Sequence, residues 1–143
     1  MKVDRRLKDG DKVRLGNVEL TAHHHPGHTK GATSYGFSVA EGGREYQVLI
    51  VNLPSINPGV TLRGMPGYPA IGDDYARTFR DLKARSVEVW FASHAVQFRM
   101  HEKYRQGDAH DPGRFVDPKG YLAAVEKLEK LYLDQTARER AAR

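Results

Sequence analysis

Histidines occur at two places where a predicted strand ends. The first is His23-His24-His25-Pro26-Gly27-His28, in which His28 stands just after a Pro-Gly turn. The second is Ser93-His94-Ala95, which follows the apolar run of residues 87–92. Neutral imidazole is the commonest metal ligand among side chains, and loops at strand ends are well placed to present ligands. Because a catalytic zinc normally takes three protein ligands, His28 and His94 together predict only part of a site.

The histidines before the turn have two interpretations. On a strand, His23 and His25 share one face and His24 points to the other. His25 lies three residues from His28 across the turn, so it is a further candidate ligand. The alternative is that His23 to His25 are hydrogen-bonded strand residues that bind no metal.

Two hairpins are predicted to carry the first cluster. Residues 13–23 have alternating apolar positions interrupted by Gly16-Asn17, which is typical of a tight turn. Residues 34–51 alternate in the same way around Glu41-Gly42-Gly43 and predict a longer hairpin. The buried strand before His94 is expected from Ser86 to Ala92.

A long loop rich in proline and glycine is predicted over residues 52–69. Connections of this length inside a compact domain are usually functional or mobile. Ser55 and Asn57 are therefore candidate substrate contacts. The alternative for Asn57 is simple turn chemistry, because it stands in the sequence Asn57-Pro58-Gly59.

Two helices are predicted around the later strand. Asp73-Asp74 is expected to cap the first helix, and Asp117-Pro118 to open the last one. Apolar residues at helical spacing follow each start: Tyr75, Phe79 and Leu82 in the first helix, and Tyr121, Val125, Leu128 and Tyr132 in the last. The order of strands, helix, strand and helix predicts one α/β (α+β) domain over residues 1–143.

Composition excludes several classes of protein. The chain has no cysteine, so neither disulfides nor a thiolate metal site are expected. The net charge is +5, but basic and acidic residues are interleaved and no aromatic-basic platform occurs, so no nucleic-acid binding is expected. Residues 138–143 are expected to be a solvated helix end. No apolar run suits a membrane span or a signal peptide, so no membrane partner is predicted.

With these motifs in order, the chain resembles the C-terminal half of a metallo-β-lactamase-fold hydrolase, and in particular the cysteine-free di-zinc subclass of metallo-β-lactamases. The matching stretches, in chain order, are residues 8–16, Thr21-Ala22-His23, Pro26-Gly27-His28-Thr29-Lys30-Gly31, Asn57-Pro58-Gly59, Tyr68-Pro69, Asp74-Tyr75, Ser93-His94-Ala95 and residues 115–121.

The resemblance implies a fold, a cofactor and roles for two residues. The fold is half of an αββα sandwich, with one mixed sheet and helices on one face. His28 matches the histidine that completes a three-histidine zinc site, and His94 matches a ligand of the second zinc. The other four ligands of the family come from a His-x-His-x-Asp-His motif that this chain does not contain. We therefore expect a zinc hydrolase half-domain that contributes two of six ligands and is inactive alone.

The resemblance also implies a partner. A half-sandwich leaves the inner apolar face of its sheet open, and soluble proteins rarely expose such a face. We expect one of three situations. The chain pairs with a separate N-terminal half, it associates with itself as a dimer or tetramer, or it is one piece of a longer protein. The alternative function is a non-catalytic oligomeric module with incidental metal binding. A small amide or ester, such as a β-lactam, is the expected substrate of a completed site, and members of this family are often periplasmic or secreted.

Overall fold

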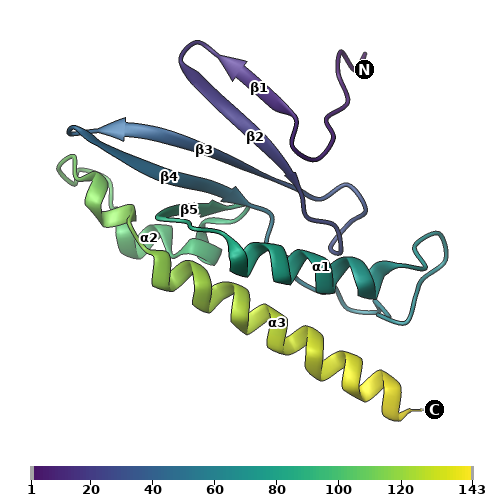
Figure 1. Cartoon of the computed structure of the whole chain (residues 1–143). Helices are drawn as coiled ribbons and strands as arrows, with labels where there is room; N and C mark the ends of the chain where they lie inside the picture. The colour runs from purple at the N-terminus through teal and green to yellow at the C-terminus, as the bar shows by residue number, and fades with distance from the viewer. Residues whose placement is uncertain (1, 143) are drawn as a thin grey trace.

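The structure is a computed structural model that describes residues 2–142, and it shows one sheet with helices against one of its faces (Figure 1). The strands are β1 (Lys12–Leu15), β2 (Val18–His24), β3 (Thr33–Glu41), β4 (Arg44–Val51) and β5 (Val89–Ala92). The α-helices are α1 (Ile71–Ala84), α2 (Met100–Lys103) and α3 (Pro118–Ala141), and the 3-10 helices are η1 (Ala95–Phe98) and η2 (Pro112–Phe115).

Both predicted hairpins are present, and glycine makes their turns possible. β1 and β2 turn at Gly16-Asn17, where Gly16 has a φ of 60°. β3 and β4 turn at Gly42-Gly43, with φ values of 59° and 77°. Glycine adopts these left-handed conformations without the steric cost that a side chain imposes. The turns therefore fix which residues of each hairpin face each other.

Strand direction brings several strand ends to one edge of the sheet. The order is β1-β2-β3-β4-β5, in which the first three pairings are antiparallel and β4 pairs with β5 in parallel. β2, β4 and β5 therefore run the same way, and their C-terminal ends lie along one edge. The segments that carry His28, Ser55 and His94 all leave the sheet at this edge.

The core lies between the sheet and helices α1 and α3, which pack together below the sheet in Figure 1. Strand residues Leu49, Val51 and Trp90 belong to it and are at most 2% exposed. Phe79 of α1 is fully buried, and Tyr121 of α3 packs edge-on against Trp90 with ring centroids 6.1 Å apart. The apolar stripes predicted for both helices are therefore confirmed as core.

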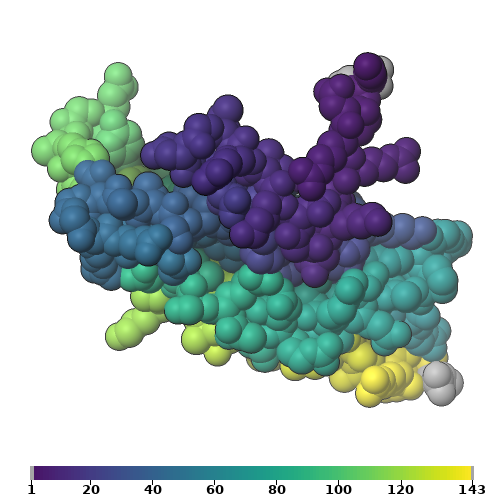
Figure 2. Space-filling model, turned by 45° about the horizontal axis from the view of Figure 1, so that its top comes forward, coloured from purple at the N-terminus to yellow at the C-terminus, as the bar shows by residue number. Residues whose placement is uncertain are grey.

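The opposite face of the sheet is largely open. The register places its side chains next to one another, as in the row Tyr35, Ile50 and Phe91. We call this surface the open apolar face: Val13, Leu15, Val18, Leu20, Tyr35, Phe37, Val39, Val48, Ile50, Val89 and Phe91. Val48 and Val89 are the buried members, at 5% and 9% exposure. Leu15 is 84% exposed and Ile50 is 41% exposed. Figure 2 shows the early strands, purple to blue, at the surface above the helices.

An apolar groove of about 190 Å³ runs across the β5 side of the open apolar face. Phe37, Val48, Val89 and Phe91 line it, and Phe115 of η2 closes one side. Contiguous apolar patches at a protein surface often mark a place that a partner covers. One mixed sheet with helices on a single face is the architecture predicted for half of an αββα sandwich.

Two sequence-based predictions were wrong in detail. Helix α1 begins at Ile71 with Ala70 as its N-cap, so Asp73 and Asp74 lie in its first turn and cap nothing. The helix starts early because Ile71 is buried at 3% exposure, and Gly72 lies directly against the Leu62 carbonyl, where a Cβ would approach to 2.4 Å. Strand β5 begins at Val89, later than Ser86.

The solvated end predicted for α3 is confirmed for Arg138, Arg140, Ala141 and Ala142, which are exposed, and residue 143 lies outside the described residues. Glu139 is the exception, because its carboxylate accepts hydrogen bonds from Thr61 and from the backbone of Leu62 and Arg63. The predicted start of α3 is confirmed: the Asp117 side chain accepts from the Gly120 N–H, and Pro118 is the first helical residue. Among residues 2–142, no helix has the length and apolar character needed to cross a membrane.

Candidate functional site

The turn that carries His28 is held from below by helix α1. Gly27 has a φ of 136°, and a Cβ placed on it would lie 2.9 Å from the ring of Tyr75. Only glycine lets the backbone pass this close to the ring. The hydroxyl of Thr78 donates to the Pro26 carbonyl over 2.7 Å. The Pro26-Gly27 turn is thus fixed on both sides immediately before His28.

The ring of His28 is oriented by the backbone that follows β4. Its Nδ1 lies 2.8 Å from the carbonyl oxygen of Ser55, and 3.3 Å from the Ser55 hydroxyl. A carbonyl oxygen can only accept, so Nδ1 carries the proton and Nε2 keeps its lone pair. Metal-binding histidines are commonly oriented in this way, by donating their other N–H to a backbone carbonyl. His28 is therefore held in the tautomer that leaves Nε2 free to bind a metal.

His94 lies at the same edge of the sheet and is exposed. It follows β5, and its backbone is tied to Gln97, since its N–H donates to the Gln97 side chain over 3.1 Å and its carbonyl accepts from the Gln97 N–H. The exposed side chain leaves its imidazole accessible to an incoming ion. β2 and β5 end at one edge, so the topology places His28 and His94 on the same side of the molecule.

Zinc is the metal that the donor types fit, because both candidates are imidazoles on ordered strand ends. Within residues 2–142, however, no group of three or more histidine, cysteine, aspartate or glutamate side chains is arranged to hold a metal ion. The part of the chain described by the structure supplies fitting ligands in too small a number for a complete site.

His25 is buried beneath the same turn and is 1% exposed. Its Nδ1 lies 2.7 Å from the Ser34 hydroxyl and its Nε2 lies 2.5 Å from a carboxylate oxygen of Asp81. Burial lowers the pKa of His25, against the opposing effect of Asp81. A metal would have to displace one of these partners to bind His25.

Asp81 is the charged member of this cluster. Burial raises its pKa, but hydrogen bonds from His25 and Arg85 outweigh that effect, so the pKa lies below its ordinary value. Arg85 reaches the same carboxylate oxygen over 2.7 Å. Asp81 is therefore ionised and shared between a histidine and an arginine.

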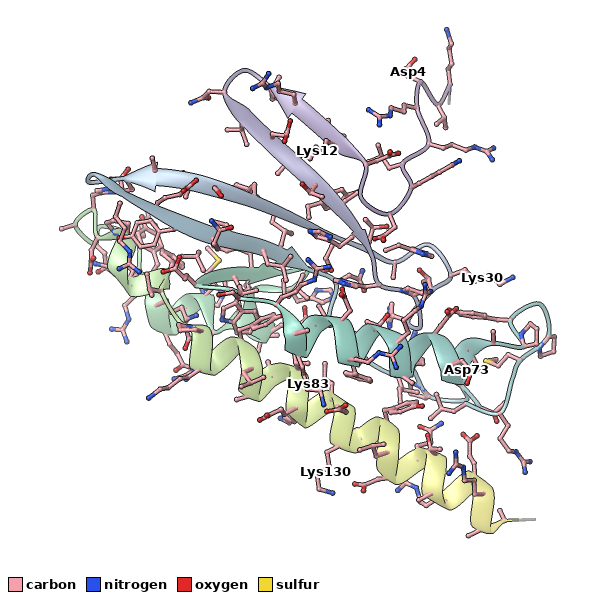
Figure 3. All side chains as sticks on the ribbon, in the orientation of Figure 1. Asp4, Lys12, Lys30, Asp73, Lys83 and Lys130 are labelled. Atoms are coloured by element: carbon pink, nitrogen blue, oxygen red, sulfur yellow. The ribbon has the colours of Figure 1, made fainter. Side chains whose placement is uncertain are left out.

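The remaining histidines of the cluster have separate surroundings. The rings of His23 and His25 stack with centroids 6.2 Å apart, so they share a face as predicted. The ring of His24 lies 2.7 Å from the carbonyl oxygen of Lys30, and its backbone N–H donates to Asp9. In Figure 3, Lys30 extends outward at the end of the molecule where α1 begins.

The two loop candidates also differ. Ser55 contacts His28 directly, through its carbonyl and its hydroxyl. Asn57 is exposed and sits in a turn, in which its carbonyl accepts from the Val60 N–H over 3.2 Å. The turn interpretation of Asn57-Pro58-Gly59 is confirmed, while contact of either residue with a substrate remains a prediction.

Sequence reasoning missed Ser34, Tyr75 and Asp81 as parts of this site. The available signal was the polar character of Thr78 and Asp81 beside the apolar stripe of α1, with Tyr75 at the same three-residue spacing. Tyr75 was placed in the core, yet its hydroxyl donates to the Ser55 carbonyl over 2.8 Å. The same carbonyl thus accepts from both Tyr75 and His28.

Comparison with known protein families gives no match for the chain. Solved structures do match. The metallo-β-lactamase GOB-18 from Elizabethkingia meningoseptica is 43% identical with a TM-score of 0.90, and the match covers 96% of this chain and 51% of that one. The class B3 di-zinc metallo-β-lactamase LRA-12 from an Alaskan soil metagenome is 41% identical with a TM-score of 0.89, over 94% of this chain and 51% of that one.

A third match extends the comparison to lower identity. The FEZ-1 metallo-β-lactamase from Legionella gormanii is 31% identical with a TM-score of 0.92, over 98% of this chain and 53% of that one. The chain spans about half the length of the structures that it matches. It is a half-domain of the metallo-β-lactamase fold, and class B3 zinc enzymes are among its structural neighbours.

Proposed function

We propose that the chain supplies one half of a zinc hydrolase site of the metallo-β-lactamase kind and is inactive without a complementary half. His28 and His94 are two of the six metal ligands. The observation that carries this proposal is the hydrogen bond from His28 Nδ1 to the Ser55 carbonyl, because it leaves the Nε2 lone pair available at a sheet edge. The accessible imidazole of His94 at the same edge supports it.

Zinc, when bound, supplies Lewis-acid activation of water and of a carbonyl group, which suits hydrolysis of an amide or ester such as a β-lactam. The residues of this chain have the task of holding and orienting that ion. The Ser55 carbonyl fixes the His28 ring, and the Ser55 side chain and Asn57 lie on the loop beside it as proposed substrate contacts.

The open apolar face supports the proposal of a complementary half, because it offers that half a surface to pack on. Packed sheets lie about 10 Å apart with their inner side chains interdigitated. The match covers about half of each enzyme. Each enzyme therefore contains a further segment, of similar size, that has no counterpart in this chain. We propose that a segment of this kind, from the same or another polypeptide, packs on the open apolar face and brings the other four ligands.

The test is complementation. The chain is mixed with the segment of the Elizabethkingia enzyme that it does not match, zinc is added, and nitrocefin hydrolysis and zinc content are measured. Turnover is expected in the mixture and in neither component alone. His28→Ala and His94→Ala should each abolish it, whereas His101→Ala, a change of an exposed histidine on α2, should not. A stable complex that binds no zinc, or turnover by the chain alone, would contradict the proposal.

A second candidate function is a non-catalytic oligomeric module whose histidines bind metal incidentally. The exposed apolar side chains Leu15 and Ile50 favour it, because two copies of this chain can bury their open apolar faces against each other. Light scattering with zinc analysis separates the two functions. A stable dimer without zinc that excludes the complementary segment supports the module, while displacement of the dimer by that segment supports the hydrolase half.

A further inference from the structure

One face of α1 contacts the His28 turn at three successive positions. Tyr75, Thr78 and Asp81 are spaced by three residues, and such residues are neighbours on a helix surface. Tyr75 binds the Ser55 carbonyl, Thr78 binds the Pro26 carbonyl, and Asp81 binds the ring of His25. We call these residues the α1 anchor. It connects the segments before and after the turn to one rigid element.

The hydrogen bonds around His25 allow only one consistent arrangement of protons for the neutral ring. The Asn52 N–H donates to the Ser34 hydroxyl oxygen over 3.0 Å. If His25 carried its proton on Nδ1, its Nε2 lone pair would face the ionised carboxylate of Asp81 at 2.5 Å, which is repulsive. Ser34 therefore donates to Nδ1, and His25 donates from Nε2 to Asp81.

These hydrogen bonds form a row from the end of β4 to α1, through Asn52, Ser34, His25 and Asp81. It contains the residue types of a serine hydrolase triad, but Ser34 is 0% exposed and its hydroxyl is occupied by Asn52 and His25. A substrate carbonyl cannot reach this hydroxyl, so nucleophilic catalysis by Ser34 is excluded. The row of hydrogen bonds instead fixes His25 between the sheet and the helix.

We propose that Asp81 is a positioning residue, which acts through His25 to keep the His28 ring in register with the Ser55 carbonyl. Only Pro26 and Gly27 separate His25 from His28, so a shift of His25 is transmitted along a turn that has little freedom of its own. In this role both ring nitrogens of His25 are hydrogen-bonded, to Ser34 and to Asp81, and His25 binds no metal. The inference rests on the proposed function of His28 as a zinc ligand.

The alternative role for Asp81 is a surface ion pair with Arg85. Two observations favour the positioning role. The partner ring of His25 is fully enclosed, which makes an unpaired Nε2–H costly. The ion pair, in contrast, is partly exposed on both sides, at 25% for Arg85 and 45% for Asp81, and such pairs contribute little.

The first test reads the His28 ring directly, in the chain without metal, by ¹⁵N NMR of the imidazole nitrogens. In the wild type we expect a protonated Nδ1 and a bare Nε2 for His28, with the opposite tautomer for His25. Asp81→Ala should mix the two tautomers of His28. Asp81→Asn should restore the wild-type pattern, because its amide oxygen accepts the same hydrogen bond from His25.

Arg85→Ala is the matched control, since it removes the ion pair and keeps the acceptor for His25. Its His28 signals should equal those of the wild type. If Asp81→Ala does not fold, His25→Phe is scored in the same way, because phenylalanine fills the ring volume without either hydrogen bond. A folded Asp81→Ala or His25→Phe variant with an unchanged His28 tautomer would overturn the proposal.

The second test uses the complemented, zinc-loaded assembly. Asp81→Ala should lower zinc affinity about 10- to 100-fold, as is usual when the residue that orients a ligand is lost, while Asp81→Asn stays within a few-fold of the wild type. The two proposals can fail separately. A complex that binds no zinc would contradict the proposed function even if the NMR result is as expected. Equal zinc affinity in Asp81→Ala and the wild type would contradict the positioning role.

Discussion

The carboxylate of Glu139 is one of the contacts by which α3 holds the long loop, and the free-energy cost of removing it can be worked out from its hydrogen bonds. It accepts from the Thr61 hydroxyl, from the N–H groups of Leu62 and Arg63, and from the Gln135 amide, over 2.8–3.1 Å. Glu139→Ala leaves the buried Leu62 N–H without this acceptor. A lost hydrogen bond to a charged group costs about 1.5–3 kcal/mol, and water can reach part of this loop, so we expect a loss of about 2 kcal/mol in the free energy of unfolding.

The measurement is urea denaturation together with thermal unfolding. A loss of about 2 kcal/mol corresponds to a fall in Tm of roughly 4–8 °C for a domain of this size. Glu126→Ala is the matched control, because Glu126 lies exposed on the same helix and the charge change is the same. Amide hydrogen exchange should show faster exchange at Leu62 and Arg63 in Glu139→Ala only.

The effect should also depend on pH. Burial raises the pKa of Glu139, but hydrogen bonds from Gln135, Leu62 and Thr61 outweigh it, so the pKa lies below its ordinary value of 4.5. A depressed carboxyl pKa stabilises the fold above the pKa of the unfolded state, and this contribution is lost as the pH falls through the folded value. The difference between wild type and Glu139→Ala should shrink below about pH 4. Equal denaturation midpoints for Glu139→Ala and Glu126→Ala at pH 7 would refute the reasoning.

Three further outcomes are expected. The wild-type chain should self-associate through its open apolar face and Ile50→Lys should weaken that association in light scattering; a monodisperse wild-type monomer near 16.1 kDa would contradict this. Zinc content of the complemented assembly should fall in His28→Ala and in His94→Ala and should decline below about pH 6 as the imidazoles protonate, whereas equal zinc in all proteins would place the ion elsewhere. Tyr75→Phe keeps the ring but removes the donor to the Ser55 carbonyl, so urea denaturation should show a loss of about 1 kcal/mol, and an unchanged midpoint would show that the hydroxyl is not needed.

The first four strands could be predicted from the sequence because their signals are local. Alternating apolar residues and glycine at positive φ in the turns specify both hairpins without reference to the rest of the molecule. The start of α1 could not be predicted in this way. Asp73 and Asp74 are good capping residues, but the burial of Ile71 and the close approach of Gly72 to the Leu62 carbonyl decide where the helix begins. Tertiary contacts outweighed the local preference.

The site divides in a similar manner. His28 and His94 could be singled out because each lies just after a predicted strand, within a short motif that resembles one of the metallo-β-lactamase family. The partners that orient His28 could not, since Ser55 lies 27 residues away along the chain and reaches the ring through its backbone, which has no sequence signature. His25 shows the same limit, because nothing near it in the sequence indicates that Asp81, 56 residues later, occupies its second nitrogen.

Under the proposed function, the open apolar face and the set of only two ligands have one structural origin, and they should therefore respond to the same change. Ile50 and Phe91 lie side by side near the ends of β4 and β5, just before the segments that carry Ser55 and His94. A partner that buries these side chains is brought directly to the sheet edge that carries the proposed ligands His28 and His94, whereas a partner bound to the helical side is not. Ile50→Lys should consequently reduce assembly with the complementary segment and zinc uptake by the same factor, although Ile50 touches no metal. The two are measured in one titration, by sedimentation and elemental analysis of each fraction. Zinc uptake that persists in Ile50→Lys after assembly is lost would separate the metal site from the open apolar face, and with it the argument that the partner completes the site.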